Sequence, residues 1–224
     1  MALAVAMVAV LGACSNSADS SPKKTTAAEQ LAAAKTKVDA ATSMPLTLRS
    51  SGLPATFTGP LASDGSRTHP TSFTGTLTAR LSGSESQING VAIDKLLYVK
   101  LPFTTDFAQV DPKTYNAPDP AQLFATEGGI TSLMTATVNP VEGKKVRVGP
   151  DVLQTITGTL PGASVAKLLN IGDATKTFDV TYGLTDPGGE LRTVVMTGPF
   201  YQGATSTYTL TLDKYGATVA ISKP

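Results

Sequence analysis

Residues 178–184 read FDVTYGL, residues 191–197 read LRTVVMT and residues 206–212 read STYTLTL. Apolar residues alternate with polar ones through most of these segments, which is the period of a β-strand with one apolar and one polar face. Turn-forming residues such as Asp186-Pro187-Gly188-Gly189 join the segments, and no helix-forming stretch lies between them. Residues 217–221, ATVAI, continue the pattern. The sequence therefore predicts a C-terminal meander of four antiparallel strands.

The same two-residue period occurs earlier in the chain. Phe73 and Leu77 belong to one long segment in which apolar residues alternate with threonines, and a turn at Asp94-Lys95 separates two segments that should pair as a hairpin. Residues 52–70 contain several Gly and Pro residues, so any strand there is expected to be short or interrupted. Strands are expected at residues 46–48, 73–81, 87–94, 96–101, 146–148 and 152–160.

Residues 25–41 predict an N-terminal helix. They are rich in Ala, Lys, Glu and Gln and contain neither Gly nor Pro. An apolar stripe that includes Leu31 and Val38 would pack on the body of the protein, and Thr26 stands three residues before Glu29, as in a capping box. The alternative is an exposed helical spacer above a membrane.

The middle of the chain has a different character. Residues 102–120 contain four prolines and three aromatic residues, which predicts a long irregular segment that still carries bulky apolar groups. Two short helices are expected next, the first capped by Asp119-Pro120 and the second ended by Pro140. A further short helix is expected at residues 163–170, with Gly172 as its terminator. The apolar residues of the first two helices are Leu123, Phe124, Ile130, Leu133 and Met134.

These elements together predict an α+β fold, with a large curved antiparallel sheet and helices on one side of it. Because β-rich units often use about 200 residues as one domain, a single domain is expected for residues 25–224.

The composition excludes several classes of function. The chain has 224 residues, of which 41% are hydrophobic and only 16% charged, and 18 basic residues against 17 acidic ones leave a formal charge of +1. Such a balance gives no broad field that would favour nucleic acid. One Cys and one His argue against an intramolecular disulfide, a zinc site, haem and thiol redox chemistry, although carboxylates alone could hold Ca²⁺ or Mg²⁺. No cofactor is expected.

The N-terminus has the pattern of a lipoprotein signal peptide. Residues 2–11 are uncharged and apolar, too few to span a bilayer as a helix but of the length of a signal-peptide core. Leu11-Gly12-Ala13-Cys14 resembles the bacterial lipobox, which implies cleavage after residue 13 and a diacylglyceryl group on Cys14. The basic region that usually opens such a peptide is missing, and an upstream start would account for this. The polar residues 14–24 are expected to be a flexible tether.

Catalytic signatures are absent from the sequence, which contains no phosphate-binding glycine loop, no Gly-x-Ser-x-Gly and no His-Glu-x-x-His. His69 precedes Pro70 in a polar stretch that predicts an exposed loop, and the three Asp-Pro pairs are ordinary turn chemistry. A basic cluster at Lys144, Lys145 and Arg147 suits either the protection of a sheet edge or contact with anionic lipid headgroups. We expect the protein not to be an enzyme.

The order of motifs along the chain resembles the LppX/LprA/LprF/LprG lipoproteins of mycobacteria. The lipobox, the polar tether and the Ala-rich helix are followed by DKLLYVKL at residues 94–101 and by TLTLDKYGATVAISKP at residues 209–224. Asp106-Phe107, Asp111-Pro112 and Asp119-Pro120 are similar to the family's middle segment. The resemblance covers nearly the whole chain after the signal peptide.

This resemblance implies a half-barrel of antiparallel strands, with helices on its concave side, around a hydrophobic cavity. Relatives bind acylated lipids and glycolipids there and are thought to carry them across the periplasm towards the outer envelope. The candidate cavity-wall residues are Phe73, Leu77, Leu97, Val99, Ile156, Phe178, Val180, Leu210 and Leu212. The candidate gate residues are Phe103, Phe107, Leu123, Phe124, Ile130, Leu133 and Met134.

Two hypotheses of function follow. The first is a lipoprotein that is anchored in the cell membrane through Cys14, faces the periplasm and carries an acylated lipid or glycolipid. The second is a ligandless envelope lipoprotein that acts as a structural or signalling partner, for example of an envelope transporter or sensor protein. Each apolar residue named above could also belong to an ordinary dry core.

Overall fold

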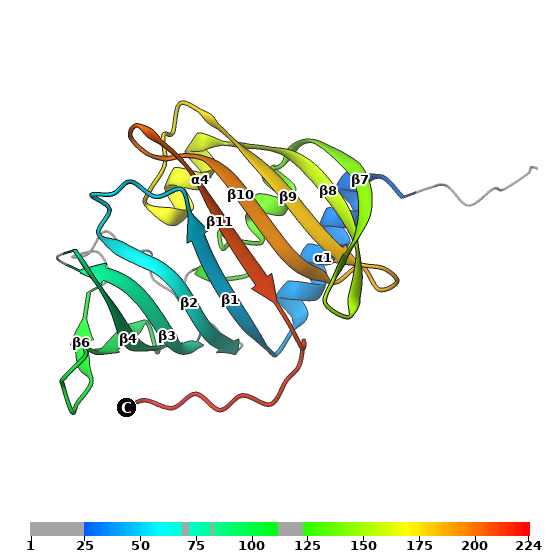
Figure 1. Ribbon diagram of the computed structural model, residues 1–224. Helices are drawn as coiled ribbons and strands as arrows, with labels where there is room; N and C mark the ends of the chain where they lie inside the picture. Colours follow the sequence, from blue (N-terminus) through cyan, green and yellow to red (C-terminus); the bar gives the residue numbers. More distant parts are fainter. Residues whose placement is uncertain (1–24, 69–71, 82, 112–122) are drawn as a thin grey trace, which may run out of the picture.

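The computed structural model describes residues 25–68, 72–81, 83–111 and 123–224. Its main feature is one curved antiparallel sheet, which is not closed into a barrel and has its helices on the concave side (Figure 1). The first group of strands is β1 (Ser43–Ser51), β2 (Gly59–Thr68), β3 (Ser72–Leu81), β4 (Ser84–Ile93), β5 (Leu96–Lys100) and β6 (Ala108–Val110). The second group is β7 (Val138–Val148), β8 (Asp151–Pro161), β9 (Thr177–Thr185), β10 (Leu191–Tyr201) and β11 (Ala204–Leu212). The helices are α1 (Ala27–Ala40), α3 (Ser132–Ala136) and α4 (Gly162–Leu169).

The sheet consists of two meanders joined side by side. The strand order is β6-β5-β4-β3-β2-β1-β11-β10-β9-β8-β7, so paired strands are neighbours in sequence except at the junction of β1 with β11. At that junction Leu46 lies opposite Leu212 and Leu48 lies opposite Leu210. The pairing of the first strand with the last therefore joins the two meanders into one continuous sheet. The α+β class with a curved antiparallel sheet is therefore confirmed.

The C-terminal meander is shorter than predicted. The strands at 178–184, 191–197 and 206–212 lie within β9, β10 and β11, but residues 217–221 form no strand. After β11 the chain runs as an extended tail along one end of the sheet (Figure 1), where the backbone N–H of Gly216 donates to the carbonyl of Ser43. The predicted fourth strand is wrong because β11 already pairs with β10 on one side and with β1 on the other.

Residues 59–68 also differ from the prediction, because β2 is a continuous strand of ten residues. A register shift between Pro60 and Ala62 absorbs the proline, which cannot donate a ladder hydrogen bond. Gly65 lies directly opposite Gly75 of β3. Turn-forming residues are thus accommodated inside a strand that its two neighbours hold in place.

Helix α1 packs on the body of the protein as predicted. Its capping box is present: the Thr26 hydroxyl accepts from the backbone N–H of Glu29 at 3.2 Å, and the Thr26 N–H donates to the Glu29 carboxylate at 2.7 Å. These hydrogen bonds lower the pKa of Glu29. Leu31 and Val38 are buried, and the helix packs against β7 and β10. The alternative of an exposed helical spacer is therefore wrong.

The shorter helices and the strand β7 also show local differences. Helix α3 forms where the second short helix was expected, but Pro140 lies inside β7 and does not end the helix. A proline is tolerated there because β7 is an edge strand. Helix α4 ends at Asn170, whose φ of 56° is left-handed, so Asn170 takes the role predicted for Gly172.

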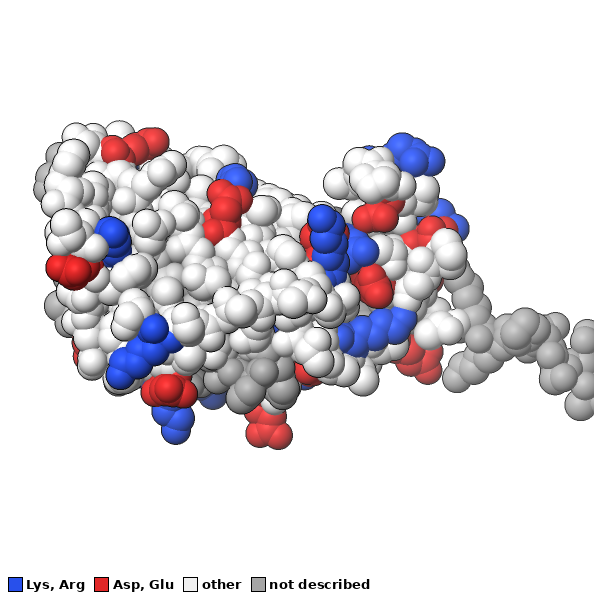
Figure 2. Space-filling view, turned by 90° about the horizontal axis from the view of Figure 1, so that it is seen from below, with Lys and Arg blue, Asp and Glu red and all other residues white. Residues whose placement is uncertain are grey.

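The basic cluster lies on the exposed edge strand β7, where Lys145 forms an ion pair with Asp186. This position agrees with the protection of a sheet edge. On the face shown in Figure 2, basic and acidic side chains are scattered without a large region of one sign.

Replacement of Leu31 tests the packing of α1. Leu31→Ala should lower the free energy of unfolding by about 2–5 kcal/mol, because it leaves a cavity between the helix and the sheet. Leu101→Ala is the matched control, since Leu101 is 47% exposed. Urea denaturation of the two variants measures the difference, and an equal small effect in both would contradict the packing described above.

Candidate functional site

A cavity of about 840 Å³ lies on the concave side of the first meander and extends to β10 and β11 of the second. Its size falls within the range of roughly 300–1,000 Å³ that is usual for ligand sites. The sheet provides one wall, and the segments around Phe124 and Ile130 and the end of α4 face it. The lining residues on strands are Leu46, Leu48, Gly59, Pro60, Ser63, Phe73, Leu77, Ile88, Gly90, Leu97, Val99, Met196, Tyr201, Tyr208 and Leu210. The other lining residues are Pro54, Thr56, Phe57, Thr58, Leu123, Phe124, Ile130, Leu169, Asn170, Ile171 and Gln202.

The register of the sheet explains why the cavity wall is apolar. Leu210, Leu48, Ser63, Leu77 and Ile88 follow one another in a row across β11, β1, β2, β3 and β4. Residues that lie opposite each other in neighbouring strands point to the same face. The row is therefore an apolar band with a single hydroxyl group at its centre.

A second row, directly beside the first, explains why the cavity has volume. Gly65, Gly75 and Gly90 lie opposite one another in β2, β3 and β4. The ring of Phe73 lies over the first two glycines, since a Cβ at Gly65 would be only 2.6 Å from it. Gly90 is more open, because a Cβ there would meet only the tip of Leu77, at 3.5 Å, and a distant backbone oxygen. Gly90 therefore leaves space that a side chain would occupy.

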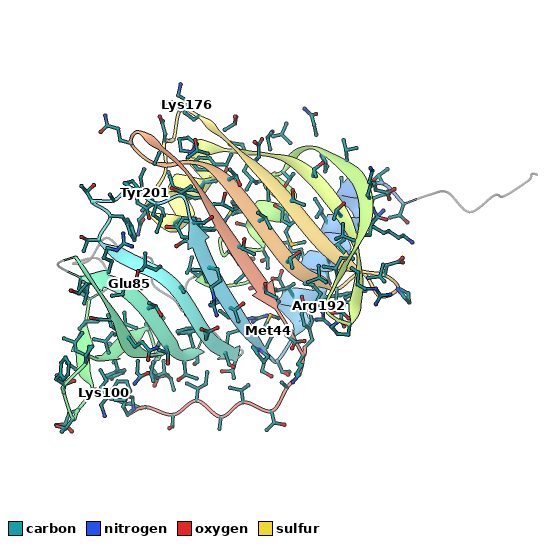
Figure 3. The ribbon with its side chains drawn as sticks, viewed as in Figure 1. Met44, Glu85, Lys100, Lys176, Arg192 and Tyr201 are labelled. Atoms are coloured by element: carbon teal, nitrogen blue, oxygen red, sulfur yellow. The ribbon has the colours of Figure 1, made fainter. Side chains whose placement is uncertain are left out.

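One end of the cavity is lined by aromatic side chains. Tyr201, at the end of β10, lies beside the loop between β1 and β2 (Figure 3), and its ring centre is 4.9 Å from that of Phe57. The Tyr201 and Tyr208 hydroxyls are hydrogen-bonded at 2.7 Å. Burial raises the pKa of both phenols. At neutral pH this end of the cavity is therefore polar and uncharged.

The second meander, in contrast, is covered by a dry core. Helices α3 and α4 pack on β8, and α4 also packs on β9. The rings of Phe178 and Phe200 make an edge contact, with ring centres 4.7 Å apart. Ile156 and Val165 are completely buried in this part. Helices α3 and α4 thus fill the concave side over β8 and β9, and the cavity lies beside them, over the first meander and the adjoining part of β10 and β11.

The structure separates the predicted wall residues into two sets. Those that line the cavity are Phe73, Leu77, Leu97, Val99 and Leu210. Those that lie in the dry core are Ile156, Phe178, Val180 and Leu212. Leu212 faces only a separate void of about 10 Å³ beneath α1.

The predicted gate residues are separated in the same way. Leu123, Phe124 and Ile130 line the cavity. Leu133 and Met134 are 3% exposed and belong to the core beneath α1. Phe103 is fully exposed, and Phe107 is half-buried away from the cavity lining.

The prediction missed several lining residues. Ser63 and the residues around Pro60 were overlooked because glycines and prolines hid the strand that carries them. Tyr208 belongs to a segment whose alternation was recognised, and that alternation places it on the same face as Leu210. Tyr201 lies beyond residue 197, where the predicted strand ended, although β10 continues to Tyr201. Gly90 has no side chain and leaves no signal in a hydropathy pattern.

No Asp, Glu, Lys or Arg is present among the described residues that line the cavity. Within the described ranges there is also no group of three or more His, Cys, Asp or Glu side chains that could hold a metal ion. No helix in the described part of the chain is long and apolar enough to cross a membrane. Cys14, the tether, His69 and Asp119-Pro120 lie outside the described residues.

Solved structures share this fold. The chain superposes on LprF from Mycobacterium bovis with a TM-score of 0.74, at 17% identity, over 88% of this chain and 96% of LprF. It superposes on the lipoprotein LppX from Mycobacterium tuberculosis with a TM-score of 0.68, at 17% identity, over 88% of this chain and 98% of LppX. No curated protein matches the chain.

The unclosed, curved antiparallel sheet above an apolar cavity is thus the fold of LprF and of the lipoprotein LppX. The LppX_LprAFG lipoprotein family matches residues 26–221. The chain belongs to this family, which confirms the resemblance found in the sequence. Membership of a lipoprotein family implies a membrane-anchored, extracytoplasmic location.

The tyrosine pair predicts a loss of stability in alkali. Because burial raises the pKa of Tyr201 and Tyr208 in the folded state, the unfolded chain releases these protons first as the pH rises above the ordinary value of 10.0. Their contribution to stability should be intact below that pH and decrease above it. The double variant Tyr201→Phe/Tyr208→Phe should lose stability less steeply between about pH 9 and about pH 12. Urea midpoints across this range measure the slopes, and equal slopes would contradict the assignment.

Proposed function

We propose that this protein is a membrane-anchored lipoprotein that binds an acylated lipid or glycolipid in its cavity and carries it across the periplasm towards the outer cell envelope. The observation that supports this proposal most strongly is the apolar cavity of about 840 Å³, whose described lining contains no charged side chain. Membership of the LppX_LprAFG family supports it independently. The anchor would be the lipidated Cys14, at the end of the tether formed by residues 14–24.

The energy of binding would come mainly from the acyl chains. Each methylene that leaves water contributes about 0.8 kcal/mol, so even a part of one chain outweighs a few polar contacts. Leu77, Ile88 and Val99 are only partly buried by the protein itself. A bound chain would complete their burial. The cavity wall would consist of Phe73, Leu77, Leu97, Val99 and Leu210, and Leu123, Phe124 and Ile130 would form the gate.

The competing hypothesis is a ligandless structural or signalling lipoprotein, and native mass spectrometry separates the two. The full chain carrying Cys14→Ser, which removes the predicted acylation site, should retain lipid after purification. The mass added to the protein should correspond to one or more acylated lipids. A protein without bound lipid that also fails to take up added lipid would contradict the carrier proposal.

Filling the cavity from its floor gives a sharper test. Gly90→Leu places a side chain in the open part of the glycine row and should lower lipid affinity by about tenfold or more, which corresponds to about 1.4 kcal/mol. Its thermal stability should change little, because the new side chain enters existing space. Gln87→Leu introduces a leucine at an exposed position of the same strand and should leave the lipid affinity unchanged. An equal loss in both variants would show that the cavity does not hold the lipid.

A further inference from the structure

Ser63 is a buried hydroxyl group without a partner. It is 8% exposed, and its Oγ is one of four buried side-chain atoms in the described residues that have no hydrogen-bond partner. The other three belong to Arg67, Tyr98 and Arg192, and none of these residues lines the cavity. Ser63 does line it. The Oγ itself exposes less than 1 Å², so the hydroxyl meets a ligand in the cavity by turning about the Cα–Cβ bond.

Among the residues that the structure describes, none is hydrogen-bonded to the Ser63 hydroxyl. Across the sheet its neighbours are Leu48 of β1 and Leu77 of β3, both of which also line the cavity. A buried hydroxyl without a hydrogen bond lowers stability by about 1–3 kcal/mol, so an apolar residue would serve better in a dry wall. The cost disappears if the bound ligand places a hydrogen-bond acceptor next to this hydroxyl.

The number of hydrogen-bond donors that the ligand would bring to Ser63 indicates which chemical group it contributes as acceptor. A ligand hydroxyl paired with Ser63 would leave one of the two protons without an acceptor, whereas an ester carbonyl accepts and has no proton of its own. A phosphate would be costly in this place, because the described lining of the cavity holds no cationic side chain to pair with it. A pure hydrocarbon would leave the hydroxyl unsatisfied. The ester group fits best.

We propose that Ser63 donates a hydrogen bond to an ester carbonyl of the bound lipid, and that this ester lies inside the cavity. The cargo is then an acyl ester whose linkage reaches the centre of the apolar row between Leu48 and Leu77. Ser63 is a specificity-determining residue that selects ester-linked chains over ether-linked ones. This inference rests on the proposed function and deepens it.

The test is a competition between two lipids that differ only at the linkage. The full chain carrying Cys14→Ser is mixed with equal concentrations of dioleoylglycerol, a diester, and di-O-oleylglycerol, the matched diether, and native mass spectrometry gives the ratio of the two complexes. The protein should favour the diester by about 2- to 10-fold, the range expected for one hydrogen bond. Ser63→Ala should bring the ratio close to one.

Two controls make the result specific. Ser66→Ala removes a hydroxyl from the opposite face of the same strand and should keep the preference for the diester. Thermal melting of Ser63→Ala should show no loss of stability, because alanine fits the site and removes an unpaired hydroxyl. An unchanged ratio in Ser63→Ala, or no preference before the substitution, would overturn the role of Ser63 while lipid binding stands. If the protein binds neither lipid, the proposed function fails with it.

Discussion

The structure depends on the mismatch between one wide apolar sheet face and the few helices that cover it in the described part of the chain. Eleven strands form a single sheet because β1 pairs with β11 and joins the two meanders. The concave side of this sheet carries apolar side chains across most of its width, and such a surface is unfavourable in water. Helices α1, α3 and α4 pack on the second meander, where they make a dry core. The first meander keeps a cavity on the same side, with side chains such as Leu77 and Val99 only partly buried.

Three details of the cavity support the proposed acylated ligand. The glycine row of β2, β3 and β4 lowers the floor, and Gly90 leaves part of it open. The tyrosine pair and Phe57 line one end with groups that are polar but uncharged at neutral pH. Ser63 places a single donor in the middle of an otherwise apolar band. The shape of the cavity, the burial of the acyl chain and the hydrogen bond from Ser63 would thus act on different parts of the same ligand. A carrier benefits from this division, since most of the affinity comes from apolar area that is insensitive to the exact lipid.

Much of the fold could be predicted from the sequence, and the failures have physical causes. Alternation is visible wherever one face of a strand is apolar and the other wet, so β3, β9 and β11 were predicted, as was α1 from its capping box and stripe. Residues 217–221 show the same alternation but form no strand, because strand formation also needs a free edge, and β1 occupies the edge of β11. The apolar residues of the cavity and of the core could not be told apart. Leu77 and Ile156 follow the same pattern, and only the position of the helices decides that one faces a cavity and the other a dry core. Ser63 and Gly90 were missed because neither is apolar.

In the proposed complex, the part of the concave face that lines the cavity, and not the core beneath the helices, holds the acyl chain. Nuclear Overhauser effects between the methylene protons of a bound lipid and methyl groups of the protein test it most directly. Contacts are expected from the lipid to Leu48, Leu77, Ile88, Leu97 and Val99, and none to Ile156, Leu160 or Val180. Contacts of equal strength to Ile156 and Val180, or a bound lipid without contacts to Leu77 and Ile88, would contradict it.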